Sequence, residues 1–293
     1  MASLRDIKRR IDGVKNTRQI TRAMKLVAGA KLRKATERAT SARPYQESLT
    51  RVLQRVAESA GEDSNQELLQ SYEEVQRIAV VIFGTDRGLC GSFNTALFRQ
   101  VEKFVNAQKE QGREVDVWML GKKAPPFFAA RSIEPDWAKQ DIKNDAYMEN
   151  VLELGKHLTA KFTAGEVQEV YLAFNTFKSV LVQNPTFAKL LPLSVEASSE
   201  DDSASDGSQI DYKYEPDPTV ILDTLVPLYL QTLIHQAFLE TEAGEHASRM
   251  TAMDNATRNA SEIVDSLTLD YNRARQAAIT TELIEIVSGA EAL

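Results

Sequence analysis

The sequence IDGVKNTRQITRAMKLVAGAKLRKATERA, residues 11–39, lies within a long stripe of apolar residues spaced by alternating steps of three and four. Counted from Leu4 to Val56, twelve of the sixteen positions in this stripe are apolar. That spacing predicts an amphipathic helix of the coiled-coil type, roughly 80 Å long at about 1.5 Å per residue. Gly13, Gly29 and Pro44 are the residues that disturb it, and Pro44 is expected to bend the helix.

The other end of the chain repeats this pattern. From Leu222 to Ala278, thirteen of the seventeen positions at the same spacing are apolar. Proline is tolerated in the first turn of a helix, so the presence of Pro227 predicts that this helix begins near Asp223 or Thr224. A second long helix is therefore expected at the C-terminus.

Each predicted helix is longer than a compact domain of ordinary size is wide. The two apolar stripes are therefore expected to pack against each other as an antiparallel coiled coil. Their many alanines allow the two backbones to approach closely. The polar positions Arg18, Lys25 and Gln236 are expected to weaken this seam.

Between the two helices, short apolar strands alternate with helical patterns. The strands are expected at the segments RIAVVIF, EVDVWML and VQEVYLAF. Helical patterns cover residues 93–109 and 147–162, and two strand-like stretches flank Asn184-Pro185. Alternation of this kind predicts a small, parallel, Rossmann-like α/β domain that ends in a hairpin.

The predicted fold class is α/β plus long α, in which the terminal helices form an antiparallel coiled coil around the α/β domain. Four segments are expected along the chain: an N-terminal coiled-coil helix at 1–58, the α/β domain at 75–193, an acidic flexible insert at 196–213 and a C-terminal helix at 219–290 that pairs with 1–58.

The charge is distributed unevenly along the chain. Residues 1–38 hold twelve Lys or Arg and three acidic residues, a net charge of +9, although the whole chain carries −7. This asymmetry favours an anionic partner for the N-terminal helix, which could be nucleic acid, a lipid surface or an acidic protein segment. A solvated basic helix face is the alternative. The first aromatic residue is Tyr45, so stacking on single-stranded bases is not expected.

Several kinds of chemistry are not supported by the sequence. Cys90 is the single cysteine, and His235 and His246 are too far apart on one helix to share a metal ion. In the turn GTDRGLCGSFN, the spacing of the glycines does not match a dinucleotide-binding or P-loop motif. We therefore expect a tight strand-to-helix turn there, and neither a catalytic site nor a cofactor or metal site. No apolar run is long enough to cross a bilayer.

Three separated motifs resemble those of ATP synthase gamma subunits. The stretch NTRQITRAMKLVAGAKLRKA resembles the N-terminal helix of that family, although Gln19, Leu26 and Gly29 replace the commoner Lys, Met and Ala. DRGLCGSFN resembles its mid-chain turn, and ASRMTAMDNAT with YNRARQAAITTE resembles its last helix. The C-terminal signature of the family is matched at Ile279, Thr280, Glu282, Glu285, Gly289, Ala290 and Ala292.

The resemblance implies the central rotor shaft of a bacterial F-type ATP synthase, which couples proton-driven rotation of the c-ring to conformational cycling of the catalytic beta subunits. The implied partners are three alpha and three beta subunits, the epsilon subunit and the c-ring, with no nucleic acid and no direct membrane insertion. The chain itself would be non-catalytic. Because MASLRDI begins the sequence without a transit signal, a peripheral position on the cytoplasmic face of a bacterial membrane is expected.

The resemblance also implies contacts with the beta subunit. Met24 would lie close to an acidic lever of beta, to which the basic N-terminal helix is suited. A catch loop of beta would contact Arg275, Gln276, Thr280 and Glu282. Ile284 stands where some relatives carry a polar residue, and the segment IEIVSGA suits a bearing.

Two other functions remain open on the residues alone. A coiled-coil adaptor or scaffold with an α/β head would form symmetric self-dimers, whereas a rotor shaft would co-purify as one copy with alpha and beta subunits. A nucleotide-dependent α/β enzyme would bind nucleotide on titration.

Overall fold

The computed structural model describes residues 3–60, 66–142, 147–194, 215 and 217–291. The chain forms two compact units, a smaller one from Met1–Ala30 and Arg249–Leu293 and a larger one from Lys31–Ser248. Helices α1 (Leu4–Ala60) and α5 (Pro218–Glu291) contribute residues to both units. They confirm the prediction of a long helix at each end, and the predicted insert at 196–213 lies outside the described residues.

The larger unit contains a five-stranded sheet in the order β3-β2-β1-β4-β5. The strands are β1 (Arg77–Phe83), β2 (Glu114–Leu120), β3 (Trp137–Lys139), β4 (Glu169–Phe177) and β5 (Gln183–Leu191). The pairs β1–β2, β1–β4 and β2–β3 are parallel, and β5 returns antiparallel to β4. This arrangement confirms the Rossmann-like α/β domain and its closing hairpin.

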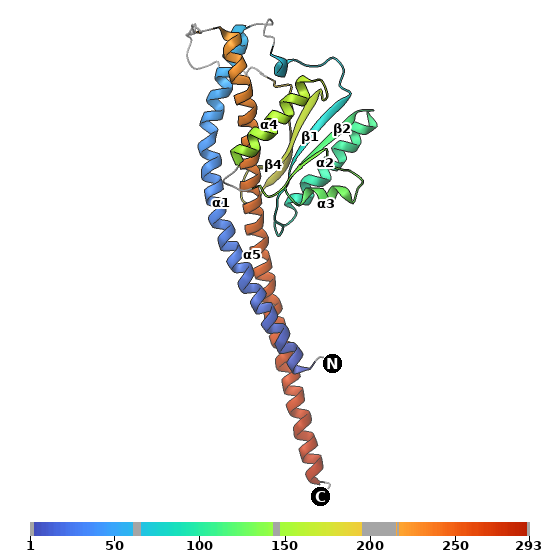
Figure 1. The fold of residues 1–293 in the computed structure, drawn as a ribbon. Coiled ribbons are helices and arrows are strands. Elements are labelled where there is room, and N and C mark those ends of the chain that lie inside the picture. Colours follow the sequence, from blue (N-terminus) through green and yellow to red (C-terminus); the bar gives the residue numbers. More distant parts are fainter. Residues whose placement is uncertain (1–2, 61–65, 143–146, 195–214, 216, 292–293) are drawn as a thin grey trace. The chain divides into compact units, whose positions relative to one another are not determined.

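Strand β1 lies at the centre of the sheet and is covered on both faces. Its residues Ala79, Val81 and Phe83 belong to an apolar cluster shared with α4 (Tyr147–Thr163) and α5. The alternate residues Ile78, Val80 and Ile82 pack with α2 (Phe93–Glu110) and α3 (Ala124–Ala129). Figure 1 shows α4 on one side of the sheet and α2 with α3 on the other. Burial on both faces explains why β1 is continuously apolar.

One layer of this domain is supplied by the long helices themselves. Residues of α5 at helical spacing, Leu222, Val226, Leu230 and Ile234, are all fully buried in the cluster that covers Phe83 and α4. Leu53 and Val56 of α1 join the same cluster. The α/β domain therefore has no complete core without residues 222–238.

The start of α5 differs from the start that was expected from Pro227. The helix begins at Pro218 and not near Asp223 or Thr224. Asp217 caps it, because its Oδ1 atom accepts hydrogen bonds from the backbone N–H of Thr219 at 2.9 Å and from the Thr219 hydroxyl at 2.5 Å. Pro227 consequently lies inside the helix. The packing of its neighbours into the core compensates for the backbone hydrogen bond that a proline removes.

The sheet also differs from prediction at its edge. Pro185 lies inside β5, opposite Asn175, and the turn of the hairpin comes earlier in the chain, at residues 178–182. Strand β5 is at the edge of the sheet, where a proline is tolerated because one side of the strand has no neighbouring strand. The short elements η1 (Glu67–Leu69), α3 and β3 were not predicted. Helix α1 continues through Pro44.

Candidate functional site

In the smaller unit, α1 and α5 run antiparallel and meet along a narrow seam (Figure 1). The Thr257 hydroxyl donates to the Thr21 hydroxyl at 2.8 Å, and Lys25 Nζ lies 2.6 Å from Asp254 Oδ1. The hydrogen bond from Lys25 holds the pKa of Asp254 below its ordinary value. Lys25, predicted to weaken the seam, therefore has an ion-pair partner across it.

Small side chains let the two backbones come close. A Cβ atom on Gly29 would lie 3.3 Å from the Met250 sulfur; Ala28, next to Gly29, and Ala260, further along α5, are both buried. Because residues 21, 25 and 29 of α1 meet residues 257, 254 and 250 of α5, the first residue of α1, Leu4, falls opposite the region of Arg275.

Beyond that point α5 presents its side chains to solvent. All described side chains from Arg275 to Ser288 are exposed. Five of them are large and apolar, with exposed fractions of about one half or more: Ile279 49%, Leu283 57%, Ile284 59%, Ile286 63% and Val287 56%. A contiguous apolar surface of this kind marks a protein contact.

Four of the residues predicted to contact the beta subunit lie on this exposed end. Arg275, Gln276, Thr280 and Glu282 occupy two consecutive turns, and the Thr280 hydroxyl donates to the Gln276 carbonyl at 2.9 Å. Met24 is half-buried on α1, one residue before the Lys25–Asp254 pair. It is roughly 30 Å from Arg275 along the helices at about 1.5 Å per residue. The structure therefore groups the four C-terminal residues and leaves Met24 at a separate place.

The glycine-rich turn after β1 lies in the larger unit, where a nucleotide-binding fold places phosphate. A Cβ atom on Gly84 would be 2.7 Å from the Leu120 carbonyl oxygen, so close packing requires glycine there. Asn94 Oδ1 accepts the N–H of Thr85 at 3.2 Å, and its amide nitrogen donates to the Thr85 hydroxyl at 2.8 Å. Gly91 has a φ of 58°, which glycine adopts without strain.

The crevice at the carboxyl ends of β1 and β4 is filled by the chain itself. Phe93 is 4% exposed, and its ring lies against Gly244 of α5, whose added Cβ would be 2.7 Å from ring atom Cε2. Asn175, buried at the end of β4, donates to the Phe93 carbonyl at 3.3 Å. In this sheet α5 occupies the position where open α/β sheets bind their ligands.

Two polar clusters were not found by sequence reasoning. The first centres on Asp86, whose carboxylate accepts backbone N–H groups from Lys122 at 3.0 Å, Asp141 at 3.2 Å and Ile142 at 2.9 Å. It ties the turn after β1 to two loops that follow β2 and β3. The signal in the sequence is slight, because a single Asp in a turn that also contains glycine is common.

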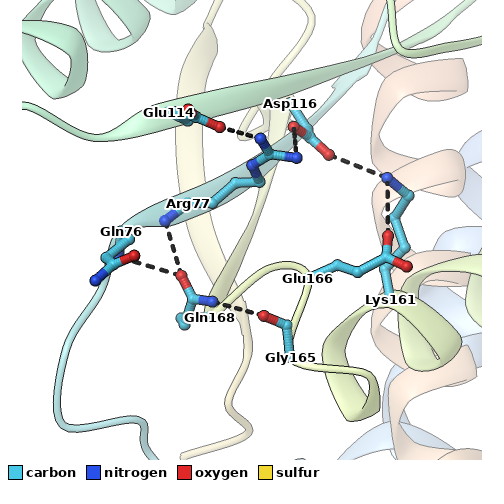
Figure 2. Close-up of polar contacts among 8 residues, drawn as sticks. All are labelled: Gln76, Arg77, Glu114, Asp116, Lys161, Gly165, Glu166 and Gln168. Atoms are coloured by element: carbon cyan, nitrogen blue, oxygen red, sulfur yellow. Dashed lines mark hydrogen bonds and ion pairs between the residues drawn. The ribbon is translucent and has the colours of Figure 1, made fainter.

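The second cluster lies at the amino-terminal edge of the sheet (Figure 2). Asp116 is buried in β2, and its carboxylate lies 3.1 Å from Lys161 Nζ and 3.9 Å from Arg77 Nη1. Arg77 also pairs with Glu114, and Lys161 lies 3.5 Å from Glu166. Burial lowers the pKa of Lys161, but the hydrogen bond and charge of Asp116 outweigh it, so this pKa is raised overall.

Backbone groups complete this edge. Gln168 Oε1 accepts the N–H groups of Gln76 at 3.1 Å and Arg77 at 2.7 Å, while its Nε2 donates to the Gly165 carbonyl at 2.7 Å. The cluster joins the start of β1, the start of β2 and the end of α4. Its members come from distant parts of the chain, so no spacing in the sequence reveals it.

Within the described ranges, no three His, Cys, Asp or Glu side chains are grouped as metal ligands would be. None of the helices in those ranges contains a stretch apolar enough to span a bilayer.

Known proteins resemble the chain along its whole length. The family model described as ATP synthase matches residues 3–293. The ATP synthase gamma chain of Syntrophobacter fumaroxidans is 42% identical over 293 residues, which cover 100% of this chain and 99% of that protein. The gamma chain of Geobacter metallireducens is 44% identical over 294 residues, with the same coverage. The chain belongs to the ATP synthase gamma chain family.

Solved structures share the fold. The rotor of the Euglena gracilis mitochondrial ATP synthase superposes with a TM-score of 0.66 at 19% identity, covering 94% of this chain and 98% of that one. The central stalk of the Tetrahymena thermophila mitochondrial enzyme gives a TM-score of 0.61 at 21% identity, covering 81% and 99%. The chain is a subunit of an ATP synthase, and its role is that of the central rotor shaft.

Proposed function

We propose that this chain turns inside a ring of three alpha and three beta subunits, and that the catalytic sites of the complex lie on the beta subunits. Rotation of a proton-driven c-ring, against which the α/β domain and an epsilon subunit would sit, drives the chain. In this proposal residues 1–58 and 219–290 are the shaft and residues 75–193 the domain that receives the rotation. The complex lies on the cytoplasmic face of a bacterial membrane, with this chain peripheral to it.

The observation that carries the proposal is the exposed apolar end of α5. An isolated helix with Ile279, Leu283 and Ile286 exposed to water is unfavourable, and a ring of partner subunits would cover it. Apolar contacts are not directional, so they hold the end of a shaft in place without fixing its angle. The exposed end therefore has the properties of a bearing.

Polar residues on the same end suit a different contact. Arg275, Gln276, Thr280 and Glu282 offer directional hydrogen bonds and charges, which a loop of a beta subunit would engage at one rotary angle. Met24 lies where a second part of beta, an acidic lever, would press on the basic residues of α1. These five residues are the proposed contacts with beta.

Reconstitution with purified alpha, beta and epsilon subunits tests this function. The ring is fixed to a surface, and a bead is attached through biotin to an Asn106→Cys substitution on α2, where Asn106 is exposed. We expect rotation in steps on addition of ATP, and no ATP hydrolysis by the chain alone. Turnover by the pure chain, or symmetric self-association without alpha and beta, would contradict the proposal.

A further inference from the structure

Glu240 of α5 lies where three elements of the larger unit meet. Its side chain is 8% exposed. One carboxylate oxygen, Oε2, accepts the backbone N–H of Phe177 at the end of β4 at 2.7 Å. The other, Oε1, accepts a hydrogen bond from Gln236 at 2.8 Å and lies 3.9 Å from Nη2 of Arg43 on α1. A single buried carboxylate thus contacts α1, α5 and the sheet.

One turn further along α5, Gly244 brings the helix backbone against the sheet. A Cβ atom there would lie 2.7 Å from Cε2 and 3.2 Å from Cζ of Phe93, and 3.5 Å from Cγ of Gln183. Phe93 has little freedom to move, because its ring is buried and Asn175 binds its carbonyl. Gly244 and Phe93 therefore interlock, and no larger residue than glycine fits without displacing the ring.

These two contacts differ in kind from those in the preceding part of α5. Residues 222–238 meet the sheet and α4 through buried apolar side chains. Apolar contacts oppose separation, but their transfer energy follows the area removed from water and does not favour one angle between the helix and the sheet. A hydrogen bond weakens steeply as its angle and distance change, and a steric interlock has no room to slide.

Torque acts on α5 in the direction of movement that the hydrogen bond and the steric interlock resist. A shaft that turns with the α/β domain experiences a twist of α5 about its own axis relative to the sheet. The apolar layer allows a small twist of this kind, whereas the hydrogen bond from Phe177 to Glu240 and the Gly244–Phe93 interlock oppose it. Both lie at the carboxyl edge of the sheet, beyond Phe238, the last residue of α5 that belongs to the apolar cluster.

We propose that Glu240 and Gly244 are positioning residues which lock α5 to the carboxyl edge of the sheet, so that torque passes between the α/β domain and the paired helices without twist between them. The proposal rests on the rotor function proposed above. The lock determines the torsional stiffness of the rotor and is separate from the contacts with alpha and beta. Loss of the lock leaves the catalytic sites intact and makes the rotor more compliant.

The test uses the assembled ATP synthase. Its ring of alpha and beta subunits is fixed to a surface, and a bead is attached to an Asn106→Cys substitution in α2. The angular variance of the bead is measured while the enzyme pauses. We expect Glu240→Ala and Gly244→Ala each to widen this variance about twofold, because each disrupts one of the two contacts that resist twist, the hydrogen bond to Phe177 or the interlock with Phe93. Glu240→Gln keeps an acceptor for Phe177 and should give an intermediate width. Glu262→Gln, at an exposed position of α5, is the matched control and should leave the width unchanged.

A second variant distinguishes a lock from a general loss of stability. Phe93→Leu removes the ring atoms that a methyl group introduced at position 244 would meet, so the double substitution Gly244→Ala/Phe93→Leu should restore the narrow width. ATP hydrolysis at saturating ATP should stay near the wild-type rate in all assembled variants. If Glu240→Ala does not assemble, Gly244→Ala decides the test. Two results would overturn the lock: angular widths in the assembled Gly244→Ala enzyme that equal those of the wild type, or a lower thermal stability of that enzyme without wider fluctuation. A wild-type enzyme that does not rotate at all would instead overturn the rotor function.

Discussion

Phe238 of α5 meets Phe83 of β1 edge to face, with the two ring centroids 5.0 Å apart. Phe83 ends the central strand of the sheet, and Phe238 belongs to one of the long helices. The contact joins the α/β domain to the helix by a pair of buried aromatic rings, in a geometry that aromatic side chains favour.

Replacing Phe238 by Ala should lower the free energy of unfolding by about 3–5 kcal/mol, the usual cost of removing a buried aromatic side chain. Urea unfolding of the purified chain, followed by the fluorescence of the nearby buried Trp118, measures this change. Val52→Ala is the control, because Val52 is 47% exposed and its truncation should change the free energy by less than about 0.5 kcal/mol. Equal effects of the two substitutions would contradict the packing described above.

Replacing glycine by alanine should raise the stability of the chain at positions in α1 and lower it in the turn after β1. Gly13 has no atom within 4 Å of an added Cβ, so Gly13→Ala should stabilise the chain by about 0.5–1 kcal/mol through helix propensity. Gly29→Ala should gain less, because the Met250 side chain must shift. Gly84→Ala should be destabilising, since the Leu120 carbonyl cannot move away. Thermal unfolding of the three variants gives the order, and a loss of stability in Gly13→Ala would be inconsistent with it.

The contributions of Asp116 and Lys161 to the free energy of unfolding should be coupled, because the two side chains form an ion pair. Lys161→Met leaves the buried Asp116 with one partner fewer and should cost about 1–3 kcal/mol, a value reduced from the usual cost because the Lys161 side chain is 34% exposed. Asp116→Asn combined with Lys161→Met should cost less than the two separate losses added together. A double-mutant cycle on unfolding free energies measures the coupling, and simple additivity would show that the pair contributes nothing.

Tyr171 should make the stability fall at alkaline pH. Burial, and then the hydrogen bond to Glu169, raise the pKa of Tyr171 from 10.0 to about 12. A group whose folded-state pKa is raised contributes its stability fully below the unfolded value and loses it as the pH rises through the folded value. The contribution of Tyr171 should therefore be complete below pH 10 and disappear between pH 10 and about 12.

Unfolding free energies of the wild type and Tyr171→Phe, compared across this range of pH, isolate that contribution. The difference between the two proteins should shrink as the pH rises. Phenolate absorbance of the folded protein should also show one tyrosine, absent in the variant, that ionises well after the exposed ones. A constant difference between the two proteins would contradict the raised pKa of Tyr171.

Arg275→Ala combined with Gln276→Ala should lower coupled ATP synthesis about fivefold or more, as expected when an arginine anchor is lost from a protein interface. Both side chains are exposed, so expression and thermal stability of the chain should not change. Asp270→Ala, at an exposed position one and a half turns earlier, is the matched control. Synthesis at the wild-type rate would argue against a contact with beta at these two positions.

The sequence predicted the elements whose periodicity is long or whose composition is extreme. The seam positions from Leu4 to Val56 are all buried or half-buried, and RIAVVIF forms β1 as expected from a strand covered on both faces. The start of α5 could not be predicted from Pro227, because tertiary packing around Leu222, Val226 and Leu230 compensates for that proline. Local rules do not include such packing.

The residues of the candidate site likewise include some that the sequence could predict and others that it could not. The exposed positions of Arg275 and Thr280 follow from a helix that continues beyond its partner, and the periodicity did not give the register between the two helices. Glu240 and Asp116 act through contacts with Phe177 and Lys161, which are distant in the sequence. A single sequence contains no pattern that pairs residues so far apart.

The layer that α5 adds to the α/β domain has a consequence for biosynthesis. All five strands leave the ribosome before residues 222–238, which complete the core around Phe83 and Leu172. Until then α4 covers one face of the nascent sheet without α5, and the apolar surface that α5 would cover is exposed, a state that is prone to aggregation. We expect the α/β domain to become protease-resistant only after α5 has been synthesised, so that translation arrested before residue 222 leaves a product that depends on chaperones.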